Sequence, residues 1–133
     1  FASTEYVAAS LLDMRWHTLS APEQLDALAF EAQVMDEIGM IPSIVTRYRT
    51  PYFGHVWGGG YAAGYYSYMW AEVLDADAFE YFKAQGIFNP ELARSFRENI
   101  LEPGGSVPPM ELYVRFRGQE PEVAPLLARR GFQ

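Results

Sequence analysis

The chain has 133 residues, of which 10 are Lys or Arg and 17 are Asp or Glu, giving a formal net charge of -7. A nucleic-acid-binding surface needs basic residues to neutralise phosphates, so this balance argues against nucleic acid as a partner. Half of the residues are apolar and a fifth are charged, which excludes a disordered chain. The absence of cysteine excludes a disulfide framework and a thiol nucleophile.

The longest stretch without a charged residue, residues 50–71, is long enough on length alone to cross a membrane. It contains five glycines, five tyrosines, a proline and a histidine, which a lipid-facing helix disfavours, so we expect no membrane partner. No secretory signal is visible at the N-terminus, where Glu5, Asp13 and Arg15 interrupt any apolar run. We therefore expect a cytoplasmic protein.

Two helices are expected in the first 40 residues. The first covers residues 3–19, where apolar side chains recur at helical spacing. The second is expected to open at Ser20, because Ser20 and Glu23 have the spacing of a capping box, and to stop at Gly39. Residues 40–60 are rich in proline and glycine, and we expect them to be irregular.

A long helix is expected from Gly60 or Tyr61 to about Ala84, either continuous or with a break at residues 74–77. It contains most of the segment in which tyrosine and glycine are concentrated. Its start therefore decides how the tyrosine side chains are arranged.

Three shorter helices complete the chain. Asn89 followed by Pro90 is a helix start signal, and that helix should end at the Pro-Gly-Gly turn of residues 103–105. Two further helices are expected over residues 108–117 and 121–130. No segment shows the alternation typical of a strand, so the predicted class is all-α.

Only two histidines are present, His17 and His55, separated by 38 positions. A catalytic zinc site usually has three protein ligands, often two histidines of an H-E-x-x-H helix and a carboxylate. No such pair occurs here, so the chain is expected to bind no metal by itself. Each histidine can equally be a hydrogen-bonded structural residue.

Arginine outnumbers lysine nine to one, a bias that suits recognition of carboxylates. Arg47 and Arg49 flank the tyrosine-rich segment, and ordinary ion pairs within the chain would explain them as well. Arg129 and Arg130 near a helix C-terminus are explained by the helix dipole.

Tyr61, Tyr65, Tyr68 and Glu72 would lie within about 60° of one another on a helix that begins at Tyr61, at about 100° per residue. Three phenol hydroxyls on one face, preceded by His55 and a glycine run, form an array of hydrogen-bond donors that could face a cleft. A tyrosine of ordinary pKa near 10 stays protonated at neutral pH and can donate to a developing oxyanion. Spacing alone is also compatible with half-buried packing residues.

The sequence resembles the C-terminal part of the thimet oligopeptidase and neurolysin family of zinc metallopeptidases, with the closest likeness to bacterial peptidyl-dipeptidases (dipeptidyl carboxypeptidases). The residues that carry the resemblance are SLLDMRWH at residues 10–17, RYR at 47–49, YFGHVWGGGYAAGYYSYMW at 52–70, FRENILEPGGS at 96–106 and the final LLARRG. They extend over nearly the whole chain. The triple glycine, in place of a double one, favours the dipeptidase branch over endopeptidases.

The resemblance implies a helical sub-domain of a larger two-lobed, zincin-like helical peptidase that cleaves oligopeptides. It implies that Tyr61 and Tyr68 are catalytic and donate to the scissile carbonyl oxygen or the tetrahedral intermediate. It assigns substrate-binding positions to His55, Tyr61, Tyr65, Tyr68, Gly59 and Gly60, with the glycines letting the loop close over the peptide. These roles favour the donor array over simple packing.

The family's zinc-binding H-E-x-x-H helix, third ligand and general-base glutamate have no counterpart in this sequence. The resemblance therefore implies that residues 1–133 are the C-terminal part of the catalytic domain, with zinc bound by the upstream part of the parent enzyme and none by this chain. We expect this chain alone to hydrolyse nothing.

The alternative function is a stand-alone helical module that uses the tyrosine-rich segment to bind peptides or sugars. An upstream H-E-x-x-H in the parent gene would separate the two hypotheses. A portion of a larger enzyme should also expose apolar faces, which predicts self-association, with a monomeric sub-domain as the alternative.

Overall fold

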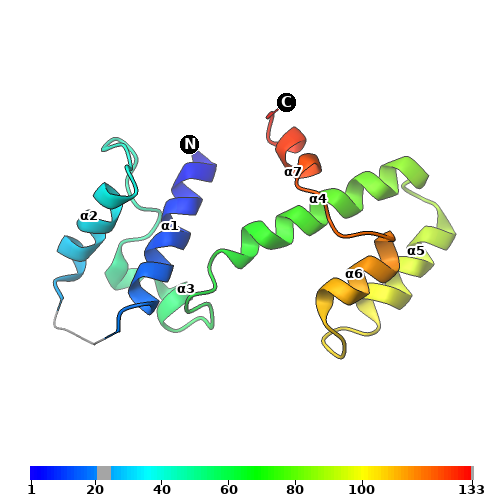
Figure 1. Cartoon of the computed structure of the whole chain (residues 1–133), viewed down its shortest axis with the longest axis horizontal. Helices are drawn as coiled ribbons and strands as arrows, with labels where there is room; N and C mark the ends of the chain where they lie inside the picture. Colours follow the sequence, from blue (N-terminus) through cyan, green and yellow to red (C-terminus); the bar gives the residue numbers. More distant parts are fainter. Residues whose placement is uncertain (21–24, 133) are drawn as a thin grey trace. The chain divides into compact units, whose positions relative to one another are not determined.

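The computed structural model describes residues 1–20 and 25–132, and every regular element within these ranges is a helix (Figure 1). The predicted all-α class is confirmed for these residues. The chain forms two compact units, Phe1–Tyr68 and Met69–Gln133. Among the described helices, none combines the length and the apolar character that a membrane crossing requires.

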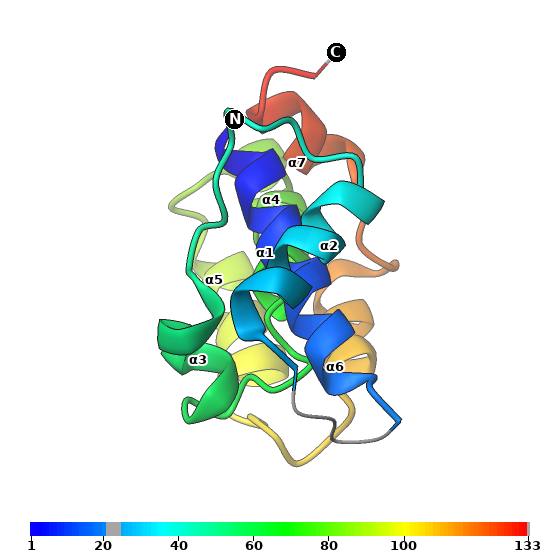
Figure 2. The same ribbon diagram turned by 90° about the vertical axis from the view of Figure 1, so that its left-hand side faces the viewer.

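The first unit is built on helices α1 (Ala2–His17) and α2 (Ala27–Glu37), which lie side by side (Figures 1 and 2). Leu12, Phe30 and Val34 form a buried core between them. Trp16 packs on this core, with its ring centroid 4.3 Å from that of Phe30. The predicted first helix is confirmed to within two residues at each end.

Helix α2 begins later than the sequence suggests. Its N-cap is Asp26, whose carboxylate accepts a hydrogen bond from the backbone N–H of Ala29 at 2.7 Å. The expected capping box runs from Ser20 to Glu23, and its last three residues lie outside the described residues. The expected stop is confirmed, because Gly39 follows the helix with a left-handed φ of 68°.

Residues 40–60 are largely irregular, as expected, but they contain two short turns that the sequence analysis did not include. These are the 3₁₀ turn η1 (Thr50–Tyr52) and the single-turn helix α3 (Gly54–Trp57). Phe53 and Val56 of this segment join Ala9 and Tyr65 in a second buried cluster. That cluster places the tyrosine-rich segment against α1.

Helix α4 (Ser67–Gln85) begins about six residues later than predicted. The expected start at Gly60 or Tyr61 is wrong, because residues 62–66 form turns and Ala63 has a positive φ of 52°, which ends helical geometry there. The alternative of a break at residues 74–77 is also wrong, since α4 is continuous through them.

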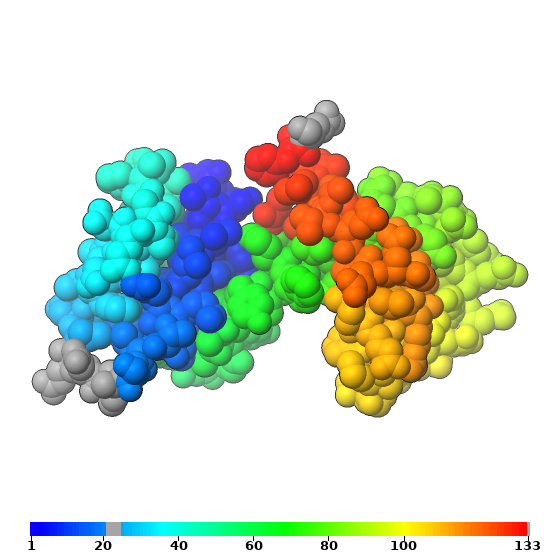
Figure 3. Space-filling view, in the orientation of Figure 1, coloured from blue at the N-terminus to red at the C-terminus, as the bar shows by residue number. Residues whose placement is uncertain are grey.

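The second unit contains most of α4 together with α5 (Pro90–Phe96), η2 (Arg97–Leu101), α6 (Pro109–Arg117) and α7 (Ala124–Arg129). The side chain of Asn89 caps α5 by accepting from Glu91 N and Leu92 N, which confirms the predicted start. Segment η2 is a π-helical continuation of α5, and it packs directly on α6 in the space-filling view, where the two are yellow to orange (Figure 3).

The core of the second unit is aromatic and encloses the side chain of Asp77. Phe116 lies at its centre, with ring centroids 5.1 Å from Phe96 and 5.8 Å from Phe82. Asp77 is 1% exposed and accepts from the Tyr113 hydroxyl at 2.6 Å and from Arg117 Nε at 3.0 Å. These bonds satisfy a carboxylate that would otherwise be costly to bury.

Candidate functional site

The tyrosine-rich segment turns sharply between His55 and Tyr61. The backbone N–H of Tyr61 donates to the carbonyl oxygen of His55 at 3.2 Å and so closes the glycine loop. A Cβ atom on Gly59 would lie 2.8 Å from that same oxygen, so this position accepts glycine alone without rearrangement. Gly60 has a φ of 81°, which other residues rarely adopt. Backbone geometry thus explains two of the three consecutive glycines.

The loop brings together the four predicted aromatic site residues, His55, Tyr61, Tyr65 and Tyr68, which we call the tyrosine cluster. The His55 ring centroid lies 5.9 Å from that of Tyr61, 5.8 Å from Tyr65 and 6.3 Å from Tyr68. The rings of Tyr61 and Tyr68 are stacked at 5.0 Å, and Tyr65 meets Tyr68 edge-on at 5.6 Å. The grouping is as expected, but Tyr61 and Tyr65 both precede α4, so a shared helix does not produce it.

Burial differs sharply across the tyrosine cluster. Tyr65 is 3% exposed and packs on Tyr6 and Phe53, with ring centroids 5.2 and 4.9 Å away. Tyr68 is 40% exposed and His55 is also on the surface. Tyr65 therefore supports the cluster from inside, while Tyr68 and His55 remain accessible to a ligand.

Raised pKa values hold the hydroxyls of Tyr68 and Tyr65 in their protonated form. A hydrogen bond with Tyr61, followed by partial burial, raises the pKa of Tyr68 to about 12. Burial raises the pKa of Tyr65, although the neighbouring Arg47 guanidinium acts in the opposite direction. Protonated phenols are hydrogen-bond donors, so at neutral pH this surface presents donors to any oxygen acceptor that approaches.

The sequence analysis missed residues of α1 that contact this segment. The Asp13 carboxylate is fully buried and accepts from the backbone N–H groups of Ala63 and Tyr65, each at 3.0 Å. The hydroxyl of Tyr6 donates to the carbonyl oxygen of Tyr65. The one local signal was a carboxylate in an apolar helical stretch, and the partners lie 50 and 52 residues away.

The remaining candidates take part in contacts within the first unit. His17 Nδ1 lies 2.8 Å from the Asp13 carboxylate, and its ring packs on Trp57, so the structural interpretation of this histidine fits. Arg49 pairs with buried Glu31 at 2.8 Å, and Arg47 lies 3.6 Å from the Glu5 carboxylate. The interpretation of these arginines as ion-pair partners is confirmed.

Glu72, Arg129 and Arg130, which the sequence also singles out, lie in the second unit. Glu72, placed on the expected tyrosine face, pairs with Arg129 and Arg130 of the C-terminal segment. Arg129 also bonds Asp75 at 2.7 Å. The helix dipole is therefore not a sufficient explanation of the two arginines, because they tie the C-terminal segment to α4.

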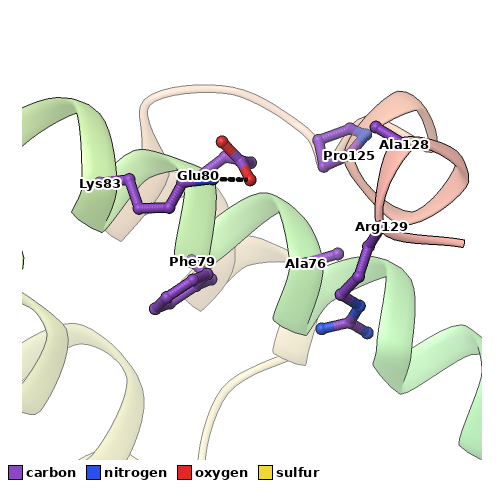
Figure 4. Close-up of a pocket in the computed structure, with 7 residues that line it drawn as sticks. All are labelled: Ala76, Phe79, Glu80, Lys83, Pro125, Ala128 and Arg129. Carbon is purple, nitrogen blue, oxygen red and sulfur yellow. Dashed lines mark hydrogen bonds and ion pairs between the residues drawn. The ribbon is translucent and has the colours of Figure 1, made fainter. Parts of the chain in front are cut away.

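A pocket of about 290 Å³ lies between α4 and α7 (Figure 4). Its floor is apolar, with Ala76, Phe79 and Pro125, while Arg129 lines its edge and Lys83 pairs with Glu80 at 2.6 Å. The cations at this pocket are thus already paired with carboxylates of the same unit. None of the predicted site residues lines it.

The described residues do not offer a fit for zinc. Within residues 1–20 and 25–132 there is no group of three or more His, Asp or Glu side chains placed to hold a metal ion. His17 pairs with Asp13, and His55 lies among tyrosine rings.

The chain belongs to peptidase family M3, whose family model matches residues 2–132. It is 42% identical over 133 residues to dipeptidyl carboxypeptidase of Escherichia coli (strain K12), covering 98% of this chain and 20% of that protein. It is 46% identical over 125 residues to oligopeptidase A of Salmonella typhimurium, covering 92% of this chain and 18% of that protein. The chain thus spans about a fifth of the length of the curated relatives it matches, and the family resemblance is confirmed.

Proposed function

We propose that this chain is the C-terminal, substrate-binding part of the catalytic domain of a zinc peptidyl-dipeptidase, which releases dipeptides from the C-termini of oligopeptides. The observation that carries the proposal is the tyrosine cluster, in which stacked Tyr61 and Tyr68 present hydrogen-bonded phenols beside accessible His55. Membership of peptidase family M3 supports a peptide as the ligand. The name of one relative, dipeptidyl carboxypeptidase, supports dipeptide release.

Tyr61 and Tyr68 act as donors to the carbonyl oxygen of the scissile peptide bond. The rings of Tyr61 and Tyr68 are stacked at 5.0 Å, and a carbonyl oxygen that replaces the hydrogen bond between their hydroxyls can accept from both. Negative charge grows on that oxygen as the carbonyl carbon becomes tetrahedral, so the two hydrogen bonds strengthen in the transition state. A donor of this kind contributes about 2.7 to 4 kcal/mol of transition-state stabilisation.

His55 and the glycine loop bind the peptide backbone in this proposal. The His55 ring is exposed beside Tyr68 and can hydrogen-bond a backbone group of the substrate. Gly59 and Gly60 carry no side chain, which lets a peptide approach the loop backbone closely. Tyr65 lies beneath them and fixes their positions rather than contacting substrate through an exposed ring.

The zinc that activates water in this family is assigned to a part of the parent enzyme outside the chain. The absence of a suitable group of ligands among the described residues supports that assignment. We place the parent enzyme in the cytoplasm. The exposed apolar residues Val7 and Leu11 support self-association of the isolated chain.

The test is peptidase activity of the parent enzyme carrying Tyr68→Phe. Turnover should fall about 100- to 1,000-fold, because one donor to the developing oxyanion is lost. Tyr66→Phe is the matched control, since it removes the hydroxyl of an exposed neighbour and should leave turnover unchanged. Near-normal turnover of Tyr68→Phe would refute the donor role, and binding of sugars in place of peptides would favour the stand-alone module.

A further inference from the structure

Asp13 is an unusual residue for the middle of a packed helix. Its side chain is fully buried between α1 and the tyrosine-rich segment. A buried carboxylate is unfavourable unless several donors satisfy it. Two backbone N–H groups donate to the Asp13 carboxylate, those of Ala63 and Tyr65 at 3.0 Å. Nδ1 of His17 lies 2.8 Å from the same carboxylate and 2.9 Å from the backbone carbonyl oxygen of Asp13. Ala63, Tyr65 and His17 all belong to the first unit, as Asp13 does.

Both backbone donors lie in the turn that precedes α4. Ala63 has a φ of 52°, a left-handed conformation that is unfavourable for a residue other than glycine. The hydrogen bond from its N–H to Asp13 offsets that cost. At Tyr65, α1 binds the backbone on both sides, because the N–H donates to Asp13 and the carbonyl oxygen accepts from the Tyr6 hydroxyl.

This turn determines where the site tyrosines lie. Tyr61 precedes Ala63 by two residues, and Tyr68 follows Tyr65 by three. Continuation of α4 back to Tyr61 would change the path of the backbone between these tyrosines. Their stacked arrangement at 5.0 Å is therefore made by the turn, and the turn is fastened to α1 at Ala63 and Tyr65.

We infer that Asp13 is a positioning residue, whose carboxylate holds the turn before α4 so that the Tyr61 and Tyr68 rings stack on each other. The inference rests on the proposed function, because it concerns the same two tyrosines. All residues that carry it lie in the first unit. It follows that the 133-residue chain forms the tyrosine cluster before any peptide binds.

The test compares Asp13→Asn with the unsubstituted 133-residue chain by NMR with labelled tyrosine rings. Replacing one carboxylate oxygen by an NH₂ group sets a donor against a backbone N–H, so one of the two bonds to the turn is lost. We expect loss of the ring-to-ring nuclear Overhauser effect between Tyr61 and Tyr68. We also expect the pKa of Tyr68 to fall from about 12 toward the ordinary tyrosine value of about 10.

Asp36→Asn is the matched control, because it makes the same chemical change at an exposed position of α2. It should leave both signals as they are in the unsubstituted chain. An Asp13→Asn chain that keeps its helical circular dichroism, the ring contact and the high Tyr68 pKa would overturn the inference. A lower melting temperature with both signals retained would assign Asp13 to fold stability alone.

Tyr6→Phe decides the question if Asp13→Asn does not fold. It removes the hydroxyl bond to the Tyr65 carbonyl and keeps the ring that stacks on Tyr65 at 5.2 Å. We expect a weaker contact between Tyr61 and Tyr68 and a smaller fall in the Tyr68 pKa, and unchanged values would overturn the inference. These measurements need no peptide, so failure of the donor role in the parent enzyme would be seen separately.

Discussion

The carboxylate of Glu31 binds Thr50 twice, accepting from its backbone N–H at 2.8 Å and from its hydroxyl at 3.1 Å. The same carboxylate accepts from Thr46 at 3.0 Å and from Arg49 at 2.8 Å. The indole N–H groups of Trp16 and Trp57 also donate to Thr50, to its hydroxyl and its carbonyl oxygen. A single residue of α2 thus holds the loop that leads into the tyrosine-rich segment.

Glu31→Gln should destabilise the first unit by about 1 to 3 kcal/mol, because a buried acceptor of four hydrogen bonds becomes partly a donor. The free energy of unfolding can be measured with urea, following the indole N–H signals of Trp16 and Trp57 by NMR. Glu120→Gln, at an exposed loop position, is the control and should change the free energy little. An equal effect of both substitutions would contradict this account.

The acid dependence of the same unit follows from Glu31. Burial alone would raise the pKa of this carboxyl, but the hydrogen bonds from Thr50, Arg49 and Thr46 outweigh it and lower the pKa. A lowered pKa in the folded state means that the stabilisation is present above the unfolded value of about 4.3. It is lost as the pH falls through the folded pKa. The difference in the free energy of unfolding between the unsubstituted chain and Glu31→Gln should therefore shrink as the pH falls. A difference that does not change with pH would refute the explanation.

Alkaline pH should destabilise the second unit through Tyr113. Burial, followed by the hydrogen bond to Asp77, raises the pKa of this tyrosine well above its ordinary value. The stabilisation is complete below the unfolded value of about 10 and is lost as the pH rises through the folded pKa. Tyr113→Phe should lower the free energy of unfolding by about 1 to 3 kcal/mol at neutral pH and reduce this alkaline loss. The free energy of unfolding is measured by urea titration at neutral and at alkaline pH. Tyr52→Phe, at a 66% exposed position, is the control in both titrations.

The purified 133-residue chain should hydrolyse no oligopeptide when zinc is supplied. In the proposed function the tyrosine cluster contributes only hydrogen-bond donors, and the described residues lack a group suited to hold the metal. Product analysis by mass spectrometry, with the parent enzyme as the positive control, checks this. The prediction would be contradicted by zinc-dependent hydrolysis that is lost on chelation and greatly reduced in Tyr68→Phe. That result would show that the 133-residue chain alone is sufficient for catalysis.

The isolated chain should self-associate at high concentration. Val7 and Leu11, one helical turn apart on α1, are 40% and 41% exposed. Sedimentation velocity should give a mass that rises above 15.1 kDa with concentration, and Leu11→Gln should reduce the rise. A constant mass of one chain over the whole range would contradict the prediction.

Helix boundaries set by nearby residues were predictable, and the boundary set by a distant residue was not. Asn89 and Gly39 act within one turn of the helices they limit, so the sequence locates the start of α5 and the end of α2. The start of α4 depends on Asp13, which lies 50 residues from Ala63. Local periodicity therefore placed Tyr61 on a helix that does not extend to it.

The residues of the tyrosine cluster were predictable, but the cause of their grouping was not. Tyr65 and Tyr61 both precede α4, so both reach Tyr68 through the turn held by α1 and not through a shared helix. The contribution of Tyr6 and Asp13 gave no local sign beyond an isolated carboxylate. The catalytic and binding roles of the tyrosine cluster stay predictions, which the variants described above test.

The π-helical segment η2 sets the direction in which the chain continues after α5. In a π-helix each N–H bonds the carbonyl five residues back, as Glu102 N does to Arg97 O at 2.9 Å, so the segment holds one residue more than an α-helical turn. Deleting one residue from 97–101 would restore α-helical bonding and rotate everything after it by about 100° about the helix axis. The extra residue therefore rotates the following chain about the axis of α5 and so determines where α6 can pack.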